Sequence, residues 1–386
     1  METITAIDKQ YVAGTYGRFP VELVSGKGSI LQGSDGKEYI DMGSGIGVTS
    51  FGIADDMWLA AVSAQAAKLQ HTSNLYFTEP CAKLAKALCE KTGMKKVFFS
   101  NSGAEANECA IKVARKYSAE KGAGCFTVIT LENSFHGRTL TTLSATGQDH
   151  YHELFQPLTP GFTHVKANDV QALEKMVAAV NPAAIMLECI QGEGGVVPLT
   201  EEFVQTAAKI AKEQDIPLII DEVQTGNGRT GKFYAYMHYG IEPDIVSTAK
   251  GLGGGLPIGA TLLSEKVQNV LGPGDHGSTY GGNPVCCAGA LTVVSRMDEV
   301  FLAEVKAKSD YVFSQLADAE GVEAVTGMGL MIGIKTVKSA KDVVAACMEN
   351  GVLCLTAKDK VRLLPALNIP MEVLEKAVAV IKAACK

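Results

Sequence analysis

Six short apolar or β-branched segments in the middle of the chain constrain its fold more than any other feature. They lie at 97–99, 127–131, 185–187, 217–220, 244–246 and 260–263. Amphipathic stretches, such as residues 202–213, separate several of them. This alternation of strand and helix patterns predicts an α/β fold, with a mostly parallel sheet covered by helices on both faces.

The two ends of the chain show a different pattern. Residues 21–40 predict a hairpin with a Gly-Ser-Asp-Gly turn at 33–36. From residue 284 a helical region leads to strands expected at 330–334 and 352–355, separated by a helix, and a last helix starts at 371. We therefore expect an N-terminal segment (1–50), a large domain (51–285) and a smaller α+β domain (286–386) that the N-terminal segment joins.

Length, charge and cysteine content exclude several classes of protein. The 386 residues suffice for a large core and two structural units. A net charge of -7, without any basic stretch, argues against nucleic acid as the main partner. The N-terminus lacks the pattern of a secretory signal, and no apolar run is long enough to span a membrane. The ten cysteines include no C-x-x-C pair and no zinc-type spacing, so we expect no metal site and reduced thiols in the cytoplasm.

A lysine and an aspartate stand where two of the predicted strands end. Asp221 follows the run 217–220, and Lys250 lies among small residues shortly after the strand at 244–246. The carboxyl ends of parallel strands are where α/β proteins place their chemistry. A lysine amine can form a Schiff base with pyridoxal phosphate, and an aspartate can keep its pyridine nitrogen protonated. The pair therefore indicates a pyridoxal-phosphate site.

Residues 102–104 lie between the strand at 97–99 and a predicted helix. The N-terminus of a helix has free N–H groups and a positive dipole end, which together suit a phosphate group. Ser102, Gly103 and Ala104 are therefore candidate phosphate ligands. Taken alone, the motif fits equally well with Ser102 as a plain N-cap.

Four further residues are candidates for binding a cofactor ring or a carboxylate. Phe135 follows a strand and is suited to stack on a ring, and Arg138 is suited to grip a carboxylate. Without the lysine–aspartate pair, core packing and a surface ion pair would explain these two residues. Arg362 interrupts an apolar run, so a buried charge there needs a partner. Glu193, in a glycine-rich loop that could be a plain turn, could pair with such an arginine.

Two glycine-rich segments do not match the nucleotide-binding motifs that they approach. The run Gly226-Asn-Gly-Arg-Thr-Gly-Lys232 lacks the hydroxyl residue that should follow a P-loop lysine, because Phe233 stands there. Residues 251–256 lack the last glycine of a dinucleotide-binding turn. The sequence therefore predicts no nucleotide site at either segment.

Taken together, these motifs resemble the class III (ω-amino acid) aminotransferases of the fold type I pyridoxal-phosphate superfamily. The resemblance covers almost the whole chain. Within the family it is greatest to members that act on N2-acetyl-L-ornithine. The segments that carry it are 16–21, 71–77, 101–108, 134–139, 221–226, 276–284 and the run around Arg362.

The resemblance implies that pyridoxal 5'-phosphate is bound at the interface of a homodimer with shared active sites. Lys250 would form the Schiff base and move the proton between substrate and cofactor, while Asp221 would bind the pyridine nitrogen. Each of the remaining cofactor residues would bind one part of the group. They are Gln224 for the ring hydroxyl, Phe135 and Val223 for the ring faces, Ser102, Gly103 and Ala104 for the phosphate, and Thr279 from the second subunit.

The resemblance also implies how two different substrates share one pocket. Arg362 would grip the α-carboxylate of glutamate, and Glu193 would mask that arginine when the first substrate is bound. Arg138, assisted by Tyr16, would grip the remote carboxylate in both half-reactions. Gly17 departs from the larger residue that relatives often carry beside this tyrosine.

The expected reaction is a ping-pong transamination in arginine biosynthesis. N2-acetyl-L-ornithine and 2-oxoglutarate would give N-acetyl-L-glutamate 5-semialdehyde and L-glutamate. The alternatives within the family are ornithine, succinylornithine and 4-aminobutyrate as amine donors. An aminomutase is disfavoured by Arg362 and Glu193, and a non-catalytic binding module is disfavoured because Lys250 and Asp221 are both present.

Overall fold

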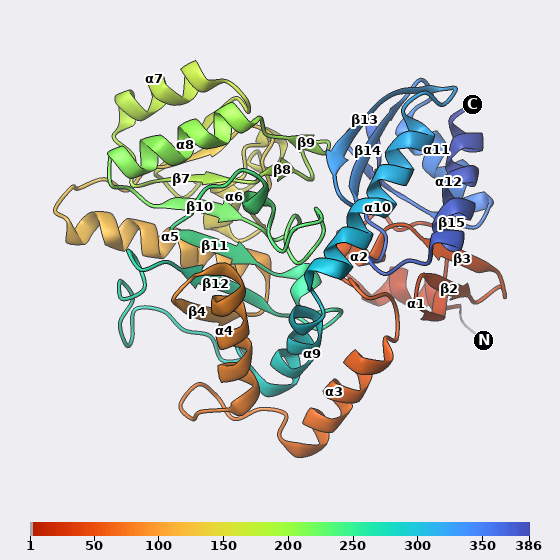
Figure 1. The fold of residues 1–386 in the computed structure, drawn as a ribbon, viewed down its shortest axis with the longest axis horizontal. Coiled ribbons are helices and arrows are strands. Elements are labelled where there is room, and N and C mark those ends of the chain that lie inside the picture. The colour runs from red at the N-terminus through yellow and green to blue at the C-terminus, as the bar shows by residue number, and fades with distance from the viewer. Residues whose placement is uncertain (1–2) are drawn as a thin grey trace.

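A seven-stranded sheet forms the centre of the larger part of the molecule (Figure 1). The computed structural model describes residues 3–386. In spatial order the strands are β4 (Lys96–Ser100), β12 (Gly259–Leu263), β11 (Ile245–Thr248), β10 (Leu218–Asp221), β7 (Ala184–Leu187), β5 (Val128–Leu131) and β6 (Phe162–Val165). β12 runs antiparallel to both of its neighbours, and the pairs β11–β10, β10–β7, β7–β5 and β5–β6 are parallel. The predicted α/β fold is confirmed, and β6 is a strand that the sequence pattern missed.

The strands read as unbroken apolar runs because both faces of the sheet are covered. Ile219 of β10 packs in the core cluster that contains the buried face of α5 (Gly103–Glu120). Its neighbours Leu218 and Ile220 pack in the cluster that contains the buried face of α8 (Glu201–Glu213). Successive side chains of one strand therefore enter different cores, as the two-residue period of a strand requires.

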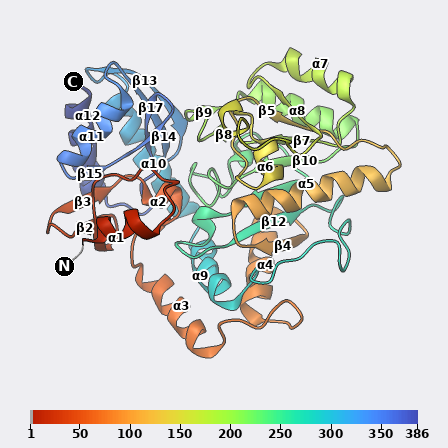
Figure 2. The same cartoon turned by 180° about the vertical axis from the view of Figure 1, so that it is seen from behind.

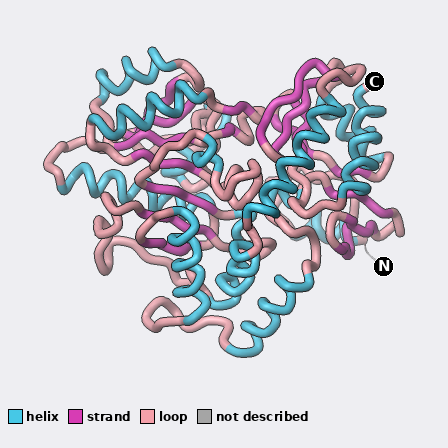
Figure 3. Tube along the Cα trace, in the orientation of Figure 1, coloured by secondary structure: helices cyan, strands magenta, loops and turns pink. Residues whose placement is uncertain are grey.

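Further helices and short strands pack on the central sheet or extend away from it, and Figure 3 shows the long loops that connect them. The helices are α2 (Ser44–Gly47), α3 (Asp56–Lys68), α4 (Glu79–Thr92), α6 (Leu140–Ala145), α7 (Val170–Val180) and α9 (Pro284–Ser295). Three single turns of 3-10 helix are η1 (Asp149–Tyr151), η2 (Ala235–His238) and η3 (Lys250–Leu252). The short strands β8 (Ile190–Gln191) and β9 (Val197–Pro198) pair with each other.

The N-terminal strands form part of a second sheet that the C-terminal region completes. Its strands are β1 (Leu23–Lys27), β2 (Ile30–Gly33), β3 (Glu38–Asp41) and β15 (Val352–Leu353), and α1 (Ile4–Tyr11) precedes them. The predicted turn at 33–36 joins β2 and β3. The predicted hairpin is confirmed as the β2–β3 pair, but β1 also pairs with β2, so the segment is a three-stranded meander rather than a hairpin alone.

The C-terminal region adds a four-stranded sheet with helices beside it, and Figure 2 shows the N-terminal strands next to it. Its elements are α10 (Glu299–Leu316), β13 (Val322–Met328), β14 (Met331–Thr336), α11 (Ala340–Glu349), β16 (Leu355–Ala357), β17 (Lys360–Leu363) and α12 (Met371–Cys385). The one strand predicted at 352–355 is divided, because β15 and β16 join different sheets. The domain boundaries at 50/51 and 285/286 stay a prediction.

The parallel strands bring several chain segments to one edge of the central sheet. Asp221 is the last residue of β10, and Glu188 directly follows β7. Ser102 and Lys250 follow β4 and β11 after one residue each. These residues lie far apart in the sequence and reach the same edge because their strands run in the same direction. Over residues 3–386, no helix combines the length and the apolar character needed to cross a membrane.

Candidate active site

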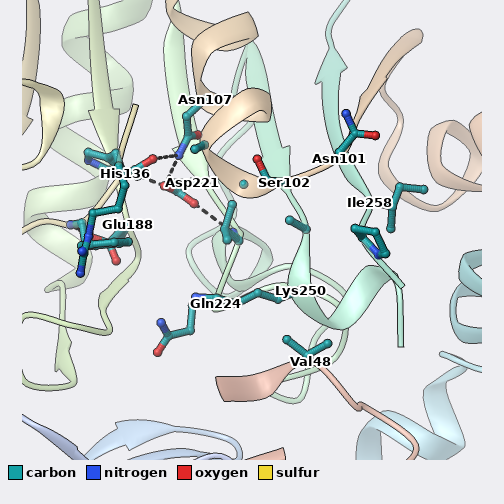
Figure 4. Close-up of a pocket in the computed structure, with 18 of the residues that line it drawn as sticks. Val48, Asn101, Ser102, Asn107, His136, Glu188, Asp221, Gln224, Lys250 and Ile258 are labelled. Atoms are coloured by element: carbon teal, nitrogen blue, oxygen red, sulfur yellow. Dashed lines mark hydrogen bonds and ion pairs between the residues drawn. The ribbon is translucent and has the colours of Figure 1, made fainter. Parts of the chain in front are cut away.

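A cavity of about 470 Å³ opens at this edge of the sheet (Figure 4). Its wall contains residues that follow or end β4, β7, β10 and β11, and residues at the N-terminus of α5. Its lining consists of Val48, Asn101, Ser102, Gly103, Ala104, Asn107, Phe135, His136, Gly137, Arg138, Glu188, Asp221, Val223, Gln224, Ala249, Lys250, Gly255, Leu256, Pro257 and Ile258. Nine of the thirteen residues proposed from the sequence are therefore members of one cavity wall.

Asp221 is buried and hydrogen-bonded at both carboxylate oxygens. Its Oδ2 accepts a bond from Asn107 Nδ2 at 2.8 Å and lies 2.8 Å from His136 Nδ1. Its Oδ1 accepts a bond from the backbone N–H of Val223 at 2.9 Å. Burial lowers the pKa of His136, but the hydrogen bond and charge of Asp221 outweigh burial and raise it. The imidazole of His136 therefore favours its protonated form beside the Asp221 carboxylate.

Lys250 lies at the start of η3 with a φ of 45°, in the left-handed region that residues with a side chain rarely adopt. Such backbone strain clusters at functional sites. Burial lowers the pKa of the Lys250 amine, and Arg362 acts in the same direction, while Glu193 and Asp221 oppose this shift. A lowered pKa increases the neutral fraction of the amine, which is the nucleophilic form.

The N-terminus of α5 forms one wall of the cavity. Ser102 is its N-cap, and its Oγ accepts a bond from the N–H of Glu105 at 3.2 Å. The first N–H groups of a helix have no partner in the helix itself, so those of Gly103 and Ala104 can bind an anion. A Cβ atom on Gly103 would lie 2.7 Å from Val223 Cγ1, so glycine is the residue that this close packing requires.

Arg362 and Glu193 form an ion pair in which the arginine is buried and the glutamate is partly exposed. Arg362 is 3% exposed, and its Nη1 lies 2.5 Å from Glu193 Oε1. Gln224 joins both, since its Nε2 donates to Glu193 and its Oε1 accepts from Arg362 Nη1 at 3.1 Å. Burial raises the pKa of Glu193, but the charge of Arg362 reverses the shift and lowers it. Among the described residues, the buried Nε of Arg362 has no hydrogen-bond partner, so one donor is left for a ligand.

Four predicted residues are not in the wall of this cavity: the paired Glu193 and Arg362, and also Tyr16 and Thr279. Tyr16 is 73% exposed and lines a separate cavity with Arg18 and Phe19. Thr279 is exposed and lines another cavity with residues 71–74. One copy of the chain therefore does not bring Tyr16 and Thr279 into the cavity that holds Lys250.

Arg138 lies at the exposed rim of the cavity. Its guanidinium carbon is 4.5 Å from the centre of the Tyr151 ring and 5.6 Å from that of Phe135. The surface ion pair considered as its simpler role is not formed with any described residue. Held against two aromatic rings, the guanidinium keeps its hydrogen-bond donors for other groups.

Sequence reasoning assigned no role to three buried polar residues of the site: Asn107, His136 and Glu188. Glu188 accepts bonds from the N–H groups of Phe135 at 2.8 Å and Gly192 at 3.3 Å. Burial raises the pKa of Glu188 to about 7, and Asp221 adds to the shift while His136 opposes it. One signal was available for Glu188, because it follows its strand directly, at the same edge of the sheet as Asp221.

Fold and cavity together define a class of enzyme that binds pyridoxal phosphate. The cavity offers an amine, a buried carboxylate in contact with an imidazole, and a helix N-terminus narrowed by glycine, which match the aldehyde, pyridine nitrogen and phosphate of that cofactor. The residues present therefore fit the group.

The chain belongs to the class-III aminotransferases. The family described as Aminotransferase class-III matches residues 11–385. Pyridoxal 5'-phosphate is accordingly its cofactor. An acetylornithine aminotransferase from Haemophilus ducreyi is 51% identical over 98% of this chain and 98% of its own length. One from Aquifex aeolicus is 45% identical over 96% of this chain and 99% of its own length.

Solved structures show the same fold. The ornithine aminotransferase from Toxoplasma gondii superposes with a TM-score of 0.94 at 32% identity, covering 100% of this chain and 95% of that one. The N-acetylornithine aminotransferase from Stenotrophomonas maltophilia gives a TM-score of 0.85 at 33% identity, covering 99% of this chain and 98% of that one.

Proposed function

We propose that the protein transfers the distal amino group of N2-acetyl-L-ornithine to 2-oxoglutarate. The products would be N-acetyl-L-glutamate 5-semialdehyde and L-glutamate, a step of arginine biosynthesis. The observation that carries the proposal is the ion pair between the buried Arg362 and Glu193, whose charges act on Lys250. The names of full-length relatives at 40–51% identity support acetylornithine as the amine donor.

The cofactor, when bound, supplies an electron-poor ring that takes up the electron pair released when a C–H bond beside the amine breaks. Lys250 Nζ would carry the proton from the substrate carbon to the cofactor carbon. Asp221 would hold a proton at the pyridine nitrogen, supported by His136 and Asn107. The residues that would hold the rest of the cofactor are Gln224 at the ring hydroxyl, Phe135 and Val223 on the ring faces, and Ser102, Gly103 and Ala104 at the phosphate.

The two half-reactions need a different net charge at one position: a positive charge for glutamate and none for acetylornithine. Glutamate carries a carboxylate beside its reacting amine, and acetylornithine carries its carboxylate far from that amine. In the structure, Glu193 neutralises Arg362, which suits the uncharged carbon beside the distal amine of acetylornithine. Movement of Glu193 would free Arg362 for glutamate, while Arg138 would grip the remote carboxylate of either substrate.

We also propose a homodimer in the cytoplasm, with each subunit completing the other's site. Thr279 of a second copy would reach the phosphate, since Thr279 lines a surface cavity away from Lys250 in its own chain. In the chain segment that follows residues 71–74 of the same cavity, the apolar side chains of Leu75 and Phe77 are almost fully exposed. Apolar side chains exposed to this extent in one loop favour an interface between subunits. Tyr16 is proposed to approach the remote carboxylate with Arg138.

The choice of amine donor is tested by adding single amines to the cofactor-loaded protein without any keto acid. We expect N2-acetyl-L-ornithine to change the visible absorbance of the cofactor far faster than ornithine, succinylornithine or 4-aminobutyrate does. Formation of glutamate after 2-oxoglutarate is added would separate a transaminase from an aminomutase. A faster response to another of these amines would refute the proposed substrate and leave the class unchanged.

Arg362→Ala should slow the glutamate half-reaction more than the acetylornithine half-reaction, by roughly 10–100-fold, because it removes a charged hydrogen-bond donor that only glutamate uses. Rapid-mixing absorbance measurements of each half-reaction would give the two rates. The matched control is Arg296→Ala, which breaks another arginine–carboxylate pair, with Asp55, outside the cavity. The control should affect both half-reactions alike, and equal losses in Arg362→Ala would contradict the role proposed for Arg362.

A further inference from the structure

The near-match to a P-loop, residues 226–232, has no part in the function proposed above. The segment follows the strand that ends in Asp221, and Figure 3 shows loops crossing the region between the central sheet and the C-terminal strands. Asn227 is buried, and its Nδ2 donates to Thr248 Oγ1 at 2.9 Å and to the carbonyl of Ala249 at 3.3 Å. Since Ala249 directly precedes Lys250, the hydrogen bonds of Asn227 attach the segment 226–232 to the backbone that carries the lysine.

Arg229, in the same segment, makes hydrogen bonds to the C-terminal region. Its side chain is among the largest that are fully buried in the protein. Arg229 Nη1 donates to the carbonyl of Leu330 at 3.1 Å and to that of Pro365 at 2.6 Å. Leu330 lies between β13 and β14, and Pro365 follows the end of β17 by two residues. One guanidinium group therefore joins two separate parts of the C-terminal sheet to the segment after Asp221.

The backbone around these contacts leaves little room for adjustment. The N–H of Leu330 donates back to the carbonyl of Arg229 at 2.9 Å. A Cβ atom on Gly329, which has a φ of 60°, would lie 2.4 Å from that carbonyl oxygen. The residue before Pro365 is held as well, because Ser44 Oγ donates to the carbonyl of Leu364 at 2.5 Å. The chain just after β17 is thus fixed by two hydrogen bonds, at the second and third residues beyond Arg362.

The charge of Arg229 is not matched by a hydrogen-bonded carboxylate among the described residues. Burial lowers the pKa of Arg229 to about 9, and the nearby charge of Asp41 opposes this shift. The group stays largely protonated at neutral pH, and both of its hydrogen-bond acceptors are backbone carbonyls. Buried charge is weak evidence for stability, and its best-attested use is to specify one geometry among alternatives. Arginine suits this use because its donors lie in a rigid plane.

We propose that Arg229 is a positioning residue for Arg362. It ties the end of β17 to the segment that also anchors Lys250 through Asn227, and so sets the distance between the Arg362 guanidinium and the Lys250 amine. The inference rests on the role proposed for Arg362 in binding glutamate. Small displacements of a group that orients a substrate have large effects on rate. Loss of Arg229 should therefore act on the half-reaction that needs Arg362.

The test compares Arg229→Lys and Arg229→Met with Arg362→Ala in both half-reactions. Arg229→Lys keeps the charge and carries the test if Arg229→Met fails to fold. The matched control is Lys308→Met, because Lys308 is another buried cation that donates to a carbonyl near this strand end, that of Leu367 at 2.9 Å. Thermal unfolding of the cofactor-free proteins reports stability without any contribution from activity.

We expect both Arg229 variants to slow the glutamate half-reaction at least about tenfold more than the acetylornithine half-reaction and to raise the KM for 2-oxoglutarate. Arg229→Lys should be the milder of the two. Lys308→Met should lower the unfolding temperature and leave the ratio of the two rates unchanged. Equal losses in both half-reactions for Arg229→Lys, together with a selective loss in Arg362→Ala, would overturn the inference alone. Equal losses of rate in both half-reactions for Arg362→Ala would overturn this inference and also the role proposed for Arg362.

Discussion

Lys250→Ala should lower turnover by at least about 10⁴-fold and leave the fold intact. The substitution removes the amine that would attach the cofactor and carry the proton between two carbon atoms. It removes no salt bridge of the described structure. Alanine accepts the φ of 45° at this position no less readily than lysine does, because both side chains begin with a Cβ atom.

Steady-state assays and a circular dichroism melt would measure these two effects. Lys250→Arg is the matched control, since it keeps a positive charge of similar reach but replaces a nucleophilic amine by a guanidinium that stays protonated. We expect Lys250→Arg to be as inactive as Lys250→Ala. If either variant retained more than a few per cent of wild-type turnover, a nucleophile other than Lys250 would have to be sought.

Asp221→Asn should reduce kcat by roughly 10²–10⁴-fold while cofactor binding persists. An amide carries no negative charge to hold a proton at the pyridine nitrogen, so the ring would withdraw electrons poorly. The N-terminus of α5 and Lys250 remain to bind the cofactor. Equilibrium dialysis with the cofactor, together with steady-state rates, would separate binding from chemistry. Unchanged kcat would exclude the role proposed for Asp221.

The same variant should change how His136 titrates. Asp221 raises the pKa of His136 against the opposing effect of burial, so the pKa should fall once the carboxylate charge is gone. A raised pKa in the folded state stabilises the protein below the ordinary histidine pKa, about 6.5, and this contribution is lost as the pH rises through the raised value. The stability difference between wild type and Asp221→Asn should therefore be larger at pH 5 than at high pH. Denaturant unfolding at several pH values would measure it.

Much of the fold could be predicted because each central strand is a local pattern. The apolar runs ending before Asp221 and at 246 became β10 and β11, since burial on both faces demands unbroken apolar residues. β6 was missed because it contains His164 and Thr163, whose polarity hides the pattern. The run 352–355 looked like one strand because the sequence does not say that its halves pair with different partners.

The site was predictable where chemistry is carried by one residue at one strand end. Lys250 and Asp221 stood out for this reason, and both line the cavity. The partners of Asp221 did not stand out, because a buried histidine or asparagine has no local signature that names its acceptor. The hydrogen bond from Asn107 joins residues 114 positions apart, and that between Arg362 and Glu193 joins residues 169 positions apart.

The sequence by itself determined the α/β class, most of the central strands and the identity of the lysine and aspartate. These follow from hydrophobic period and from residue chemistry, which are local properties. Only the tertiary structure decided that His136 and Asn107 support Asp221, that Glu193 neutralises Arg362, and that Arg229 joins the C-terminal strands to the segment beside Lys250. These contacts depend on how strands and loops distant in the chain pack together. The free energy of that packing comes from many residues, so no single position in the sequence reveals it.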